Sequence, residues 1–409
     1  MKILFLTDNF PPEVNAPASR TYEHCIEWVK QGVEVTIITC NPNFPTGKLF
    51  PKYKNRLYKT EQIEGIKVIR VWSYITQNDG FIKRTLDYAS FALIAFFAGI
   101  FQRTDIIIAT SPQFFTAISG HFLSFVKNKP WVMEVRDIWP ESIAAVGALK
   151  NKFVLGFLEK IELRLYKSCT RVIVVTEAFK RNLIQRKIPQ DKIEVIKNGV
   201  DLTRFVPTKN TTNLKNSLGL QNKFLIGYFG THGMAHKLDF ILDCCAKVSS
   251  PDIFFLFIGD GAEKKHLIKQ VQELKLTNVL MLPSVTKELV VDYISILDVA
   301  LVNLKKSKTF ETVIPSKIFE NAAMLKPLLL GVEGEAKQLV ETYHCGFCFQ
   351  PEDENDFLNK LNLLYESRFD FAVYREGCAR LADDFNRRKL AIQMLEVLET
   401  ILPNNKSNS

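Results

Sequence analysis

The sequence predicts an α/β protein built from two doubly wound parallel sheets, and three observations lead to this fold class. Short apolar, β-rich runs alternate with helical stretches along the chain, which is typical of βαβ units. The polar segment 201–223 interrupts this alternation once, and the alternation then starts again. The length of 409 residues exceeds one ordinary core, so two domains of about 200 residues each are expected.

The first domain is expected over residues 1–200 and the second over 224–386, with 201–223 as the linker between them. An amphipathic helix at 387–402 is expected to complete the first domain, and residues 403–409 are expected to form a disordered tail. The predicted strands are Lys2–Thr7, Glu34–Cys40, Ile66–Trp72, Asp105–Ser111, Trp131–Val135, Arg171–Thr176, Glu194–Lys197, Phe224–Phe229, Ile253–Ile258, Val279–Leu282, Val299–Leu304, Pro327–Gly331 and Gly346–Gln350.

Composition is that of an ordinary globular protein, with 47% apolar and 24% charged residues. The eight cysteines are scattered, most of them within apolar patterns, so free thiols in a reducing compartment are expected. Cys345 and Cys348 form the only CxxC pair, and no second pair stands at a zinc-binding spacing, so no metal site is predicted. The first apolar run is too short for a signal peptide, and a cytoplasmic protein is expected.

Charge is concentrated in the first half of the chain. Residues 1–200 contain 28 Lys and Arg against 18 Asp and Glu, whereas the remainder contains 25 against 26. Fifteen uncharged residues, 88–102, are too few to cross a hydrocarbon core, which needs about 20. A core helix and a helix in the membrane interface both fit them. If the helix is interfacial, Lys83 and Arg84 are the expected anchors to an anionic inner-membrane surface, with Phe91, Phe96 and Phe97 as inserting side chains.

Two stretches of the first half carry polar residues where a parallel sheet binds ligands. Arg136 and Asp137 directly follow the apolar run 131–135, and the carboxyl end of a buried strand faces the ligand crevice of such sheets. The alternative is a surface ion pair between the two side chains. The loop after the first strand, 8–20, contains three prolines and is longer than most connections of its kind, which indicates a function.

In the second half, the stretch 229–237 leaves a strand with two glycines and opens a helix. Backbone N–H groups at such an opening can hold phosphate oxygens, to which His236 and Lys237 could add charge. The alternative is a glycine turn without a ligand. The candidate phosphate-binding residues are Gly230, Thr231, His232, Gly233, His236 and Lys237.

A second candidate stretch is 312–327. Pro315 and Ser316 are good helix openers, and they place Glu320 within the first turns of a helix. A carboxylate at this position can accept both hydroxyls of a ribose. The alternative is a glutamate that only complements the helix dipole.

The short motifs of this chain, taken in their order along the sequence, resemble those of the GT-B glycosyltransferases of family 4, which use nucleotide-sugar donors. The resemblance extends over essentially the whole chain. It rests on Pro11-Pro12, Ser111-Pro112, Arg136-Asp137-Ile-Trp-Pro, Val175-Thr176-Glu177, Asn198-Gly199-Val-Asp201, Gly230, Gly259-Asp260-Gly261 and Pro315-Ser-Lys-Ile-Phe-Glu320.

The resemblance implies two Rossmann-like domains that face each other across a cleft, with a donor site that adds Asp260, Thr312, Pro315, Ser316, Lys317 and Glu320 to the phosphate-binding residues. It also implies a retaining reaction that needs no metal and no cofactor. The absence of an Asp-x-Asp motif agrees, because metal-dependent transferases hold the cation of the donor with that motif.

Within the family, the stretches PPEVNAPASR and EVRDIWPES resemble bacterial O-antigen and capsule transferases for N-acetyl-L-fucosamine. This implies transfer from a UDP-sugar to an undecaprenyl-diphosphate-linked saccharide by a peripheral membrane enzyme of lipopolysaccharide or capsule assembly, with no nucleic-acid partner. Arg136 and Asp137 would be catalytic, one orienting the sugar or phosphate and the other the attacking hydroxyl. The implied acceptor contacts are Pro12, Glu13, Asn15 and Arg20.

The sequence departs from the family pattern at four positions. Thr312 stands where many members have a glutamate, Thr231 and His236 stand where the phosphate-binding Arg and Lys are expected, and Arg136 stands in place of a common histidine. Two alternatives therefore remain beside the transferase: a UDP-sugar 2-epimerase of the same architecture, and a catalytically silent UDP-sugar-binding subunit. The basic first half and the apolar run 88–102 argue against the epimerase, which needs no lipid acceptor.

Overall fold

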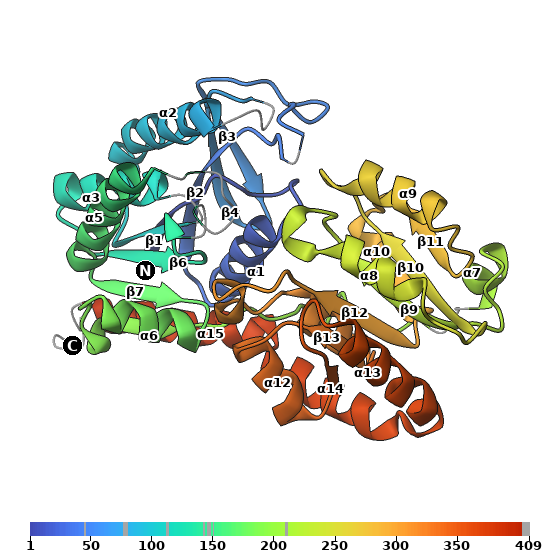
Figure 1. Ribbon diagram of the computed structural model, residues 1–409. Coiled ribbons are helices and arrows are strands. Elements are labelled where there is room, and N and C mark those ends of the chain that lie inside the picture. The colour runs from blue at the N-terminus through green and yellow to red at the C-terminus, as the bar shows by residue number, and fades with distance from the viewer. Residues whose placement is uncertain are drawn as a thin grey trace. The chain divides into compact units, whose positions relative to one another are not determined.

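The protein divides into two compact units, as seen in a computed structural model that describes residues 1–44, 46–76, 81–111, 114–141, 144, 149, 151–208 and 212–402 (Figure 1). One unit comprises Met1–Asn198 and the segment that begins at Arg387, and the other comprises Gly199–Asn386. The predicted disordered tail lies outside the described residues.

The first unit contains an eight-stranded sheet in the order β3-β4-β2-β1-β5-β6-β7-β8, in which β3 pairs antiparallel with β4 and the other neighbours pair parallel. The strands are β1 (Lys2–Leu6), β2 (Glu34–Cys40), β3 (Tyr58–Ile63), β4 (Ile66–Val71), β5 (Ile106–Thr110), β6 (Trp131–Val135), β7 (Arg171–Val174) and β8 (Ile193–Val195). The helices are α1 (Ala16–Lys30), α2 (Phe81–Ile100), α3 (Phe115–Lys127), α5 (Lys152–Ser168), α6 (Glu177–Gln185), the 3-10 turn η1 (Gln190–Lys192) and α15 (Arg387–Ile401).

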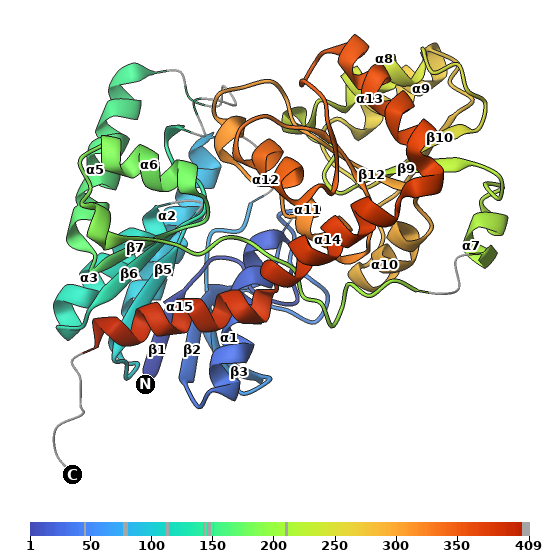
Figure 2. The same cartoon turned by 90° about the horizontal axis from the view of Figure 1, so that it is seen from below.

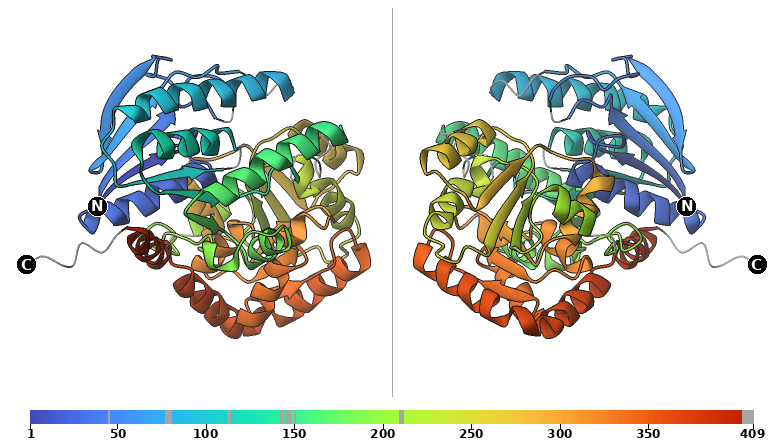
Figure 3. Two further views of the ribbon diagram at one scale, coloured as in Figure 1. Left: turned by 90° about the vertical axis from the view of Figure 1, so that its left-hand side faces the viewer. Right: turned by 90° about the vertical axis from the view of Figure 1, so that its right-hand side faces the viewer.

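Alternate residues of β1 pack into two hydrophobic layers, one on each face of the sheet, because successive side chains of a strand point to opposite faces. Leu4 and Leu6 face the layer formed with α2, α3, α5 and α6. Ile3 and Phe5 face the layer formed with α1 and α15. Helices α2 and α3 run side by side over the first layer (Figure 3).

The C-terminal helix α15 packs on α1, although the two lie at opposite ends of the chain (Figure 2). The indole nitrogen of Trp28 donates to Ala391 O at 2.8 Å, and Arg387 forms an ion pair with Glu23 at 2.6 Å. Helix α15 therefore supplies part of the core of the first unit.

The second unit contains a parallel six-stranded sheet in the order β11-β10-β9-β12-β13-β14. Its strands are β9 (Phe224–Phe229), β10 (Ile253–Ile258), β11 (Val279–Leu282), β12 (Val299–Asn303), β13 (Leu328–Gly331) and β14 (Gly346–Cys348). Its helices and 3-10 turns are α7 (Thr212–Ser217), η2 (Met234–His236), α8 (Leu238–Cys245), α9 (Lys264–Glu273), α10 (Lys287–Ser295), η3 (Phe310–Thr312), α11 (Lys317–Ala323), α12 (Glu335–Tyr343), α13 (Glu354–Glu366), η4 (Ser367–Asp370) and α14 (Ala372–Asp384). Helices α10, α11, α12 and α14 cover one face, and α8, α9 and α13 cover the other.

One strand of the first sheet was not predicted. Strand β3 has the sequence YKTEQI, which lacks an apolar run, and it lies at the edge of the sheet with its side chains alternately exposed and half-buried. An edge strand with a solvated face needs no continuous apolar stretch, so the pattern of apolar runs does not reveal β3.

Candidate functional site

The sheet of the second unit changes winding direction between β9 and β12, and the loops after these strands are tied together. From β9 the chain continues to β10 and β11 on one side, whereas β12 leads to β13 and β14 on the other. Lys305 N donates to Ala235 O at 2.8 Å, and Asn303 Nδ2 donates to His236 O at 2.9 Å. Ligands of α/β sheets bind at such a switch point, so this is the candidate ligand site of the unit.

Three glycines bring the loop after β9 against the loop after β10. A Cβ atom on Gly259 would lie 1.8 Å from the carbonyl oxygen of Gly230, and one on Gly261 would lie 2.4 Å from that of His232. His232 N donates to Asp260 O at 2.8 Å across the same contact. The predicted residues of both loops therefore form one closely packed backbone assembly that larger side chains would disrupt.

Lys317 supplies a cation to this assembly. Its ammonium donates to the hydroxyl of Tyr228 at 2.7 Å and lies 4.1 Å from the centroid of the tyrosine ring. A Cβ atom on Gly230 would lie 3.0 Å from the same Nζ, so the glycine leaves room for the ammonium. Burial lowers the pKa of Lys317 to about 7, partly offset by the charge of Glu320.

The two histidines of the loop are neutral at pH 7. Burial, followed by nearby lysine charge, lowers the pKa of His232 to about 4 and that of His236 to about 3. His232 is fully buried, and neither ring nitrogen has a hydrogen-bond partner among the described residues. Burial therefore disfavours the positive charge that was expected of His236, and Lys237 forms an ion pair with Asp239.

Helix α11 begins at Lys317, directly after Pro315 and Ser316, as the helix-opening residues predict. Glu320 lies one turn further along the helix and is half-buried. The hydroxyl of Thr312 donates to Thr309 O at 2.7 Å and is thus used within its own 3-10 turn. Of these residues, Lys317 and Glu320 keep charged groups that a ligand could use.

In the first unit, Arg136 and Asp137 directly follow β6, and both are anchored to Ser111. The hydroxyl oxygen of Ser111 accepts from Arg136 N at 2.7 Å and from Asp137 N at 3.4 Å. The guanidinium of Arg136 donates to Ala16 O and Pro17 O, and no ion pair joins it to Asp137 among the described residues. Burial raises the pKa of Asp137 to about 6, against the charge of Arg136. The surface ion pair that the sequence left open is not formed.

The loop 8–20 holds its own shape with the polar residues that were expected to contact the acceptor. Glu13 is buried, and its carboxylate accepts from Asn43 N and Phe44 N at 2.8 Å each. Burial raises the pKa of Glu13 to about 7. Asn15 caps α1 by accepting from Ala18 N at 2.9 Å. Pro12, in a cis peptide bond after Pro11, precedes Glu13 in this loop.

Arg20 also has a structural role, which argues against its expected acceptor contact. It is 1% exposed, and its Nε lies 2.9 Å from a carboxylate oxygen of Glu134. Its other nitrogens donate to Ile196 O, Lys197 O and Asn198 Oδ1. Arg20 thus ties α1 to β6 and to the segment after β8.

The five residues expected at a membrane have different surroundings. Phe91 is 1% exposed and belongs to the core, so it is not an inserting side chain. Phe96 is half-buried, and Phe97 is 52% exposed. Lys83 and Arg84 are exposed, and Arg84 donates to the hydroxyl of Tyr88. Residues 88–102 therefore combine a core face with an exposed apolar face.

The chain matches two protein-family models. Residues 18–204 match the model described as "Glycosyltransferase Family 4", and residues 210–382 match "Glycosyl transferases group 1". WcaI of Escherichia coli (strain K12), named for colanic acid biosynthesis, is 26% identical over 367 residues, which is 86% of this chain and 89% of WcaI. The chain belongs to the family 4 glycosyltransferases.

Solved structures with the same fold confirm the predicted fold class of this family 4 glycosyltransferase, the GT-B class. Anabaena HepE in complex with UDP-glucose is similar at a TM-score of 0.73 with 18% identity, covering 98% of this chain and all of HepE. The sucrose-phosphate synthase from Thermosynechococcus elongatus is similar at a TM-score of 0.78 with 15% identity, covering 98% of each chain.

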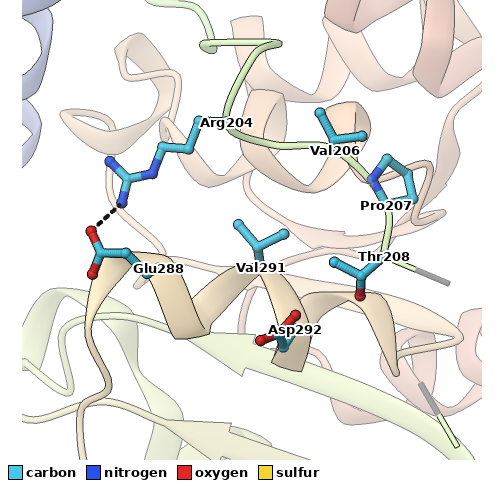
Figure 4. Close-up of a pocket in the computed structure, with 7 residues that line it drawn as sticks. All are labelled: Arg204, Val206, Pro207, Thr208, Glu288, Val291 and Asp292. Carbon is cyan, nitrogen blue, oxygen red and sulfur yellow. Dashed lines mark ion pairs between the residues drawn. The ribbon is translucent and has the colours of Figure 1, made fainter. Parts of the chain in front are cut away.

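A cavity in the second unit of the transferase is lined by none of the predicted donor residues. It measures about 570 Å³. It is lined by Arg204, Val206, Pro207 and Thr208 on the segment after β8 and by Glu288, Val291 and Asp292 of α10 (Figure 4). Arg204 and Glu288 form an ion pair across it at 3.6 Å. No predicted site residue contributes to its described lining, so its volume alone does not identify the site.

Two residues that the sequence did not single out shape the candidate sites. Tyr228, a buried residue of β9, holds the ammonium of Lys317 and donates its own hydroxyl to Thr231 O at 2.8 Å. Asn303, the last residue of β12, anchors the loop after β9. A polar atom near the carboxyl end of a buried strand was the signal that could have found both.

No helix among the described residues is long and apolar enough to cross a membrane. The described part of the chain also contains no cluster of three or more His, Cys, Asp or Glu residues with metal-binding geometry.

Proposed function

We propose that this family 4 glycosyltransferase moves a sugar from a UDP donor to an undecaprenyl-diphosphate-linked saccharide in the assembly of a bacterial surface polysaccharide such as O-antigen or capsule. The proposed donor sugar is an N-acetylated deoxyhexosamine such as N-acetyl-L-fucosamine. The similarity to WcaI, which is named for colanic acid biosynthesis, supports the polysaccharide class. The stretches 11–20 and 134–142 support the choice of sugar.

The ammonium of Lys317 beside Gly230 is the observation that carries this proposal. A nucleotide-sugar donor has a negatively charged diphosphate, and charge builds up on it as the glycosidic bond breaks. Thr231 and His236 stand at the positions where the family has Arg and Lys, and burial lowers the pKa of His236 to about 3. Lys317 of α11 is therefore the cation that lies against this loop. A positioned cation in a site with little water stabilises developing charge more strongly than it would in water.

On the donor side, Glu320 would accept hydrogen bonds from the ribose hydroxyls, while the backbone N–H groups of Thr231 and Gly233 and the Lys317 ammonium would hold the diphosphate. The N–H groups of Gly230 and His232 already donate to Ile258 O and Asp260 O. On the acceptor side, Asp137 would orient the attacking hydroxyl, and Arg136 would fix the loop through its contacts with Ala16 and Pro17. In a retaining reaction without a metal, the leaving diphosphate takes the acceptor proton on the same face of the sugar. The protein then contributes positioning and charge stabilisation.

We further propose that the enzyme works at the cytoplasmic face of the membrane, where its lipid-linked acceptor lies. The excess of Lys and Arg in the first half of the chain supports this location, because anionic lipids attract basic segments by about 1 kcal/mol per residue. Lys83 and Arg84 are exposed at the start of α2, where they can reach lipid headgroups.

A donor screen with the purified chain tests the proposal. Radiolabelled UDP-sugars are incubated with a synthetic undecaprenyl-diphosphate saccharide, and label in the lipid product is counted. Transfer from a UDP-N-acetyl-deoxyhexosamine is expected, whereas the absence of transfer from every donor contradicts the proposal. A parallel incubation with UDP-sugar alone, followed by NMR, identifies an epimerase by the appearance of a second sugar.

A further inference from the structure

An apolar groove lies between α2 and α3 of the first unit. Its volume is about 380 Å³. The single polar side chain in its described lining, Ser119, donates its hydroxyl to Ala92 O, so its polar atom is already used within the protein. The lining residues are Ala89, Ala92, Leu93, Phe96, Phe97, Phe115, Ile118, Ser119 and Phe122. A groove of this composition suits a hydrocarbon ligand and offers nothing to a charged one.

The groove opens within a larger group of exposed aromatic side chains, which we call the phenylalanine rim. Clusters of large, exposed apolar side chains are uncommon on protein surfaces, and they often mark sites of interaction with a partner or a membrane. The rim consists of Phe97 on α2, Phe101 just after α2, and Phe122 and Phe125 on α3. Phe101 and Phe125 are 82% and 83% exposed.

Helices α2 and α3 meet closely at the rim, so the exposed phenylalanines of these two helices belong to one surface. A Cβ atom on Gly99 would lie 2.6 Å from Leu123 Cδ1, which shows how near the α2 backbone comes to α3. Lys127 Nζ donates to Ile100 O at 2.9 Å and joins the C-terminal ends of the two helices.

Basic residues surround this apolar surface. Lys83 and Arg84 lie at the start of α2 and Arg103 lies just beyond its end. Lys129 follows α3. Exposed apolar side chains bordered by cations are complementary to a bilayer with anionic headgroups, because the rings enter the acyl boundary while the cations remain at the headgroups.

An aromatic cluster connects the groove with the loop that carries Asp137. Phe115 lines the groove, and its ring centroid lies 6.3 Å from that of Trp139, two residues after Asp137. The ring of Phe114 lies 4.8 Å from that of Trp139 in an edge-to-face arrangement. A hydrocarbon chain that lies in the groove would thus end beside the loop that carries Asp137.

We infer that the groove between α2 and α3 holds the hydrocarbon chain of the membrane lipid that carries the acceptor saccharide, while the phenylalanine rim rests in an anionic bilayer. This inference rests on the proposed function, which supplies a lipid-linked acceptor. The groove would guide the lipid diphosphate and its saccharide toward Asp137, and the enzyme would discriminate acceptors by the length of their lipid as well as by their sugar.

Vesicle binding tests the rim. Sedimentation with phosphatidylglycerol vesicles at low salt is compared for the wild-type chain, a Phe101→Ser/Phe125→Ser variant and the control Phe369→Ser. Phe369 is 88% exposed in the second unit, so the control removes an equally exposed ring elsewhere. The rim variant should bind at least about tenfold more weakly, since each lost ring forfeits much of its burial free energy. Equal binding by all three chains overturns the inference.

Acceptor length tests the groove. Two acceptors with the same diphosphate saccharide, one with a short phenylalkyl tail and one with a long prenyl tail, are compared in wild type and in Ala89→Phe, which fills the groove. The wild type should prefer the long tail by at least about tenfold in kcat/KM, and the variant should lose this preference while it keeps its turnover of the short acceptor. If Ala89→Phe does not fold, the smaller substitution Ala89→Leu replaces it. Its preference for the long-tailed acceptor should be weaker than that of the wild type. An unchanged preference in both variants contradicts the groove.

Failure of the proposed function is visible separately, as absence of turnover with either acceptor. Vesicles of dibrominated phosphatidylglycerol then test the groove, because bromine on a lipid chain that enters the groove should quench the fluorescence of Trp139. The quenching should be weaker in Ala89→Phe than in the wild type. The variant Trp139→Phe shows which part of the fluorescence comes from Trp139. Equal quenching in both chains overturns the inference. The inference is also overturned if the wild-type chain does not bind vesicles but forms a concentration-dependent dimer that the rim variant does not form. The rim would then be an interface between two copies of the chain.

Discussion

The ammonium of Lys317 lies 2.7 Å from the hydroxyl of Tyr228 and above its ring, at the loop that follows β9. Lys317 is half-buried, so its charge is less well solvated than that of a lysine on the protein surface. An arrangement that disfavours the charged form in the free protein but attracts an anion is typical of a binding site. Replacing Lys317 should therefore weaken ligand binding while it stabilises the free protein.

Lys317→Met should weaken UDP binding at least about tenfold, because a hydrogen bond to a charged group contributes roughly 1.5–3 kcal/mol. Isothermal titration calorimetry measures the change, and Lys265→Met, an exposed lysine of α9, is the matched control. Wild-type affinity should also fall as the pH rises above about 7, where Lys317 loses its proton, and the variant should lack this dependence. Equal affinity in variant and wild type would remove Lys317 from the site.

The same substitution should raise the thermal unfolding midpoint at pH 6. Between about pH 7 and the ordinary lysine value of 10.5, the unfolded chain keeps a proton that folded Lys317 has lost, so wild-type stability rises with pH over this window. The advantage of Lys317→Met is therefore largest at or below pH 7 and shrinks toward pH 10. Differential scanning calorimetry at pH 6 and pH 9 checks this, and a midpoint difference that grows with pH contradicts it.

Glu320→Ala should weaken UDP binding at least about tenfold while the fold survives, because two charge-assisted hydrogen bonds to the ribose are lost. Glu376→Ala, an exposed glutamate of α14, serves as the control. Calorimetry with UDP and with uracil base alone separates the ribose contact from the base contact. Unchanged UDP affinity leaves Glu320 with its helix-dipole role only.

Asp137→Asn should leave UDP binding nearly intact and reduce turnover by about a hundredfold, since positioning errors near the reacting atoms are costly. Burial raises the pKa of Asp137 to about 6, so wild-type kcat/KM should fall below that pH as the carboxylate takes up a proton. Between 3.8 and about 6 the folded state holds the extra proton, so wild-type stability decreases as the pH rises through this window. Asp191→Asn is the control, and retention of most activity by Asp137→Asn would falsify the role.

Arg20→Met should destabilise the first unit by about 3–5 kcal/mol, because it leaves the buried carboxylate of Glu134 without its partner. The double variant Arg20→Met/Glu134→Leu should recover much of this loss. Thermal unfolding followed by tryptophan fluorescence reports the change. A variant of normal stability with a raised KM for the acceptor would instead restore Arg20 to the acceptor site.

Replacing Lys83 and Arg84 by Ser should reduce binding to anionic vesicles at low salt. The difference from wild type should nearly vanish at about 0.5 M salt, where the Debye length is roughly 4 Å. Sedimentation over a salt series measures it, with zwitterionic vesicles as the reference. Wild-type protein that ignores anionic vesicles at low salt contradicts the membrane location.

The sheets could be predicted from the sequence because parallel strands are buried on both faces and leave continuous apolar runs. Strand β3 could not, because an edge strand such as YKTEQI has no such run. The glycines after β9 and β10 were recognisable for a similar reason, since close backbone contact tolerates no other residue.

The roles of polar residues were harder to predict. Glu13, Asn15 and Arg20 stand in a long loop and at the start of a helix, where a ligand contact and a structural contact use the same residue types. Only their partners, such as Asn43 N for Glu13 and Glu134 for Arg20, distinguish the two. The neutrality of His236 likewise depends on burial beside a lysine 81 positions later in the chain, which no local pattern reveals.

The return of the chain to the first unit at α15 has a consequence for biosynthesis. The ribosome completes residues 1–198 long before it makes the helix that covers Trp28, so the nascent first unit exposes part of its core until translation ends. Chaperones that bind exposed aromatic side chains should therefore associate with the nascent chain throughout synthesis of the second unit. A circular permutant that begins with α15 and then continues from Met1 should fold its first unit on the ribosome and escape that association.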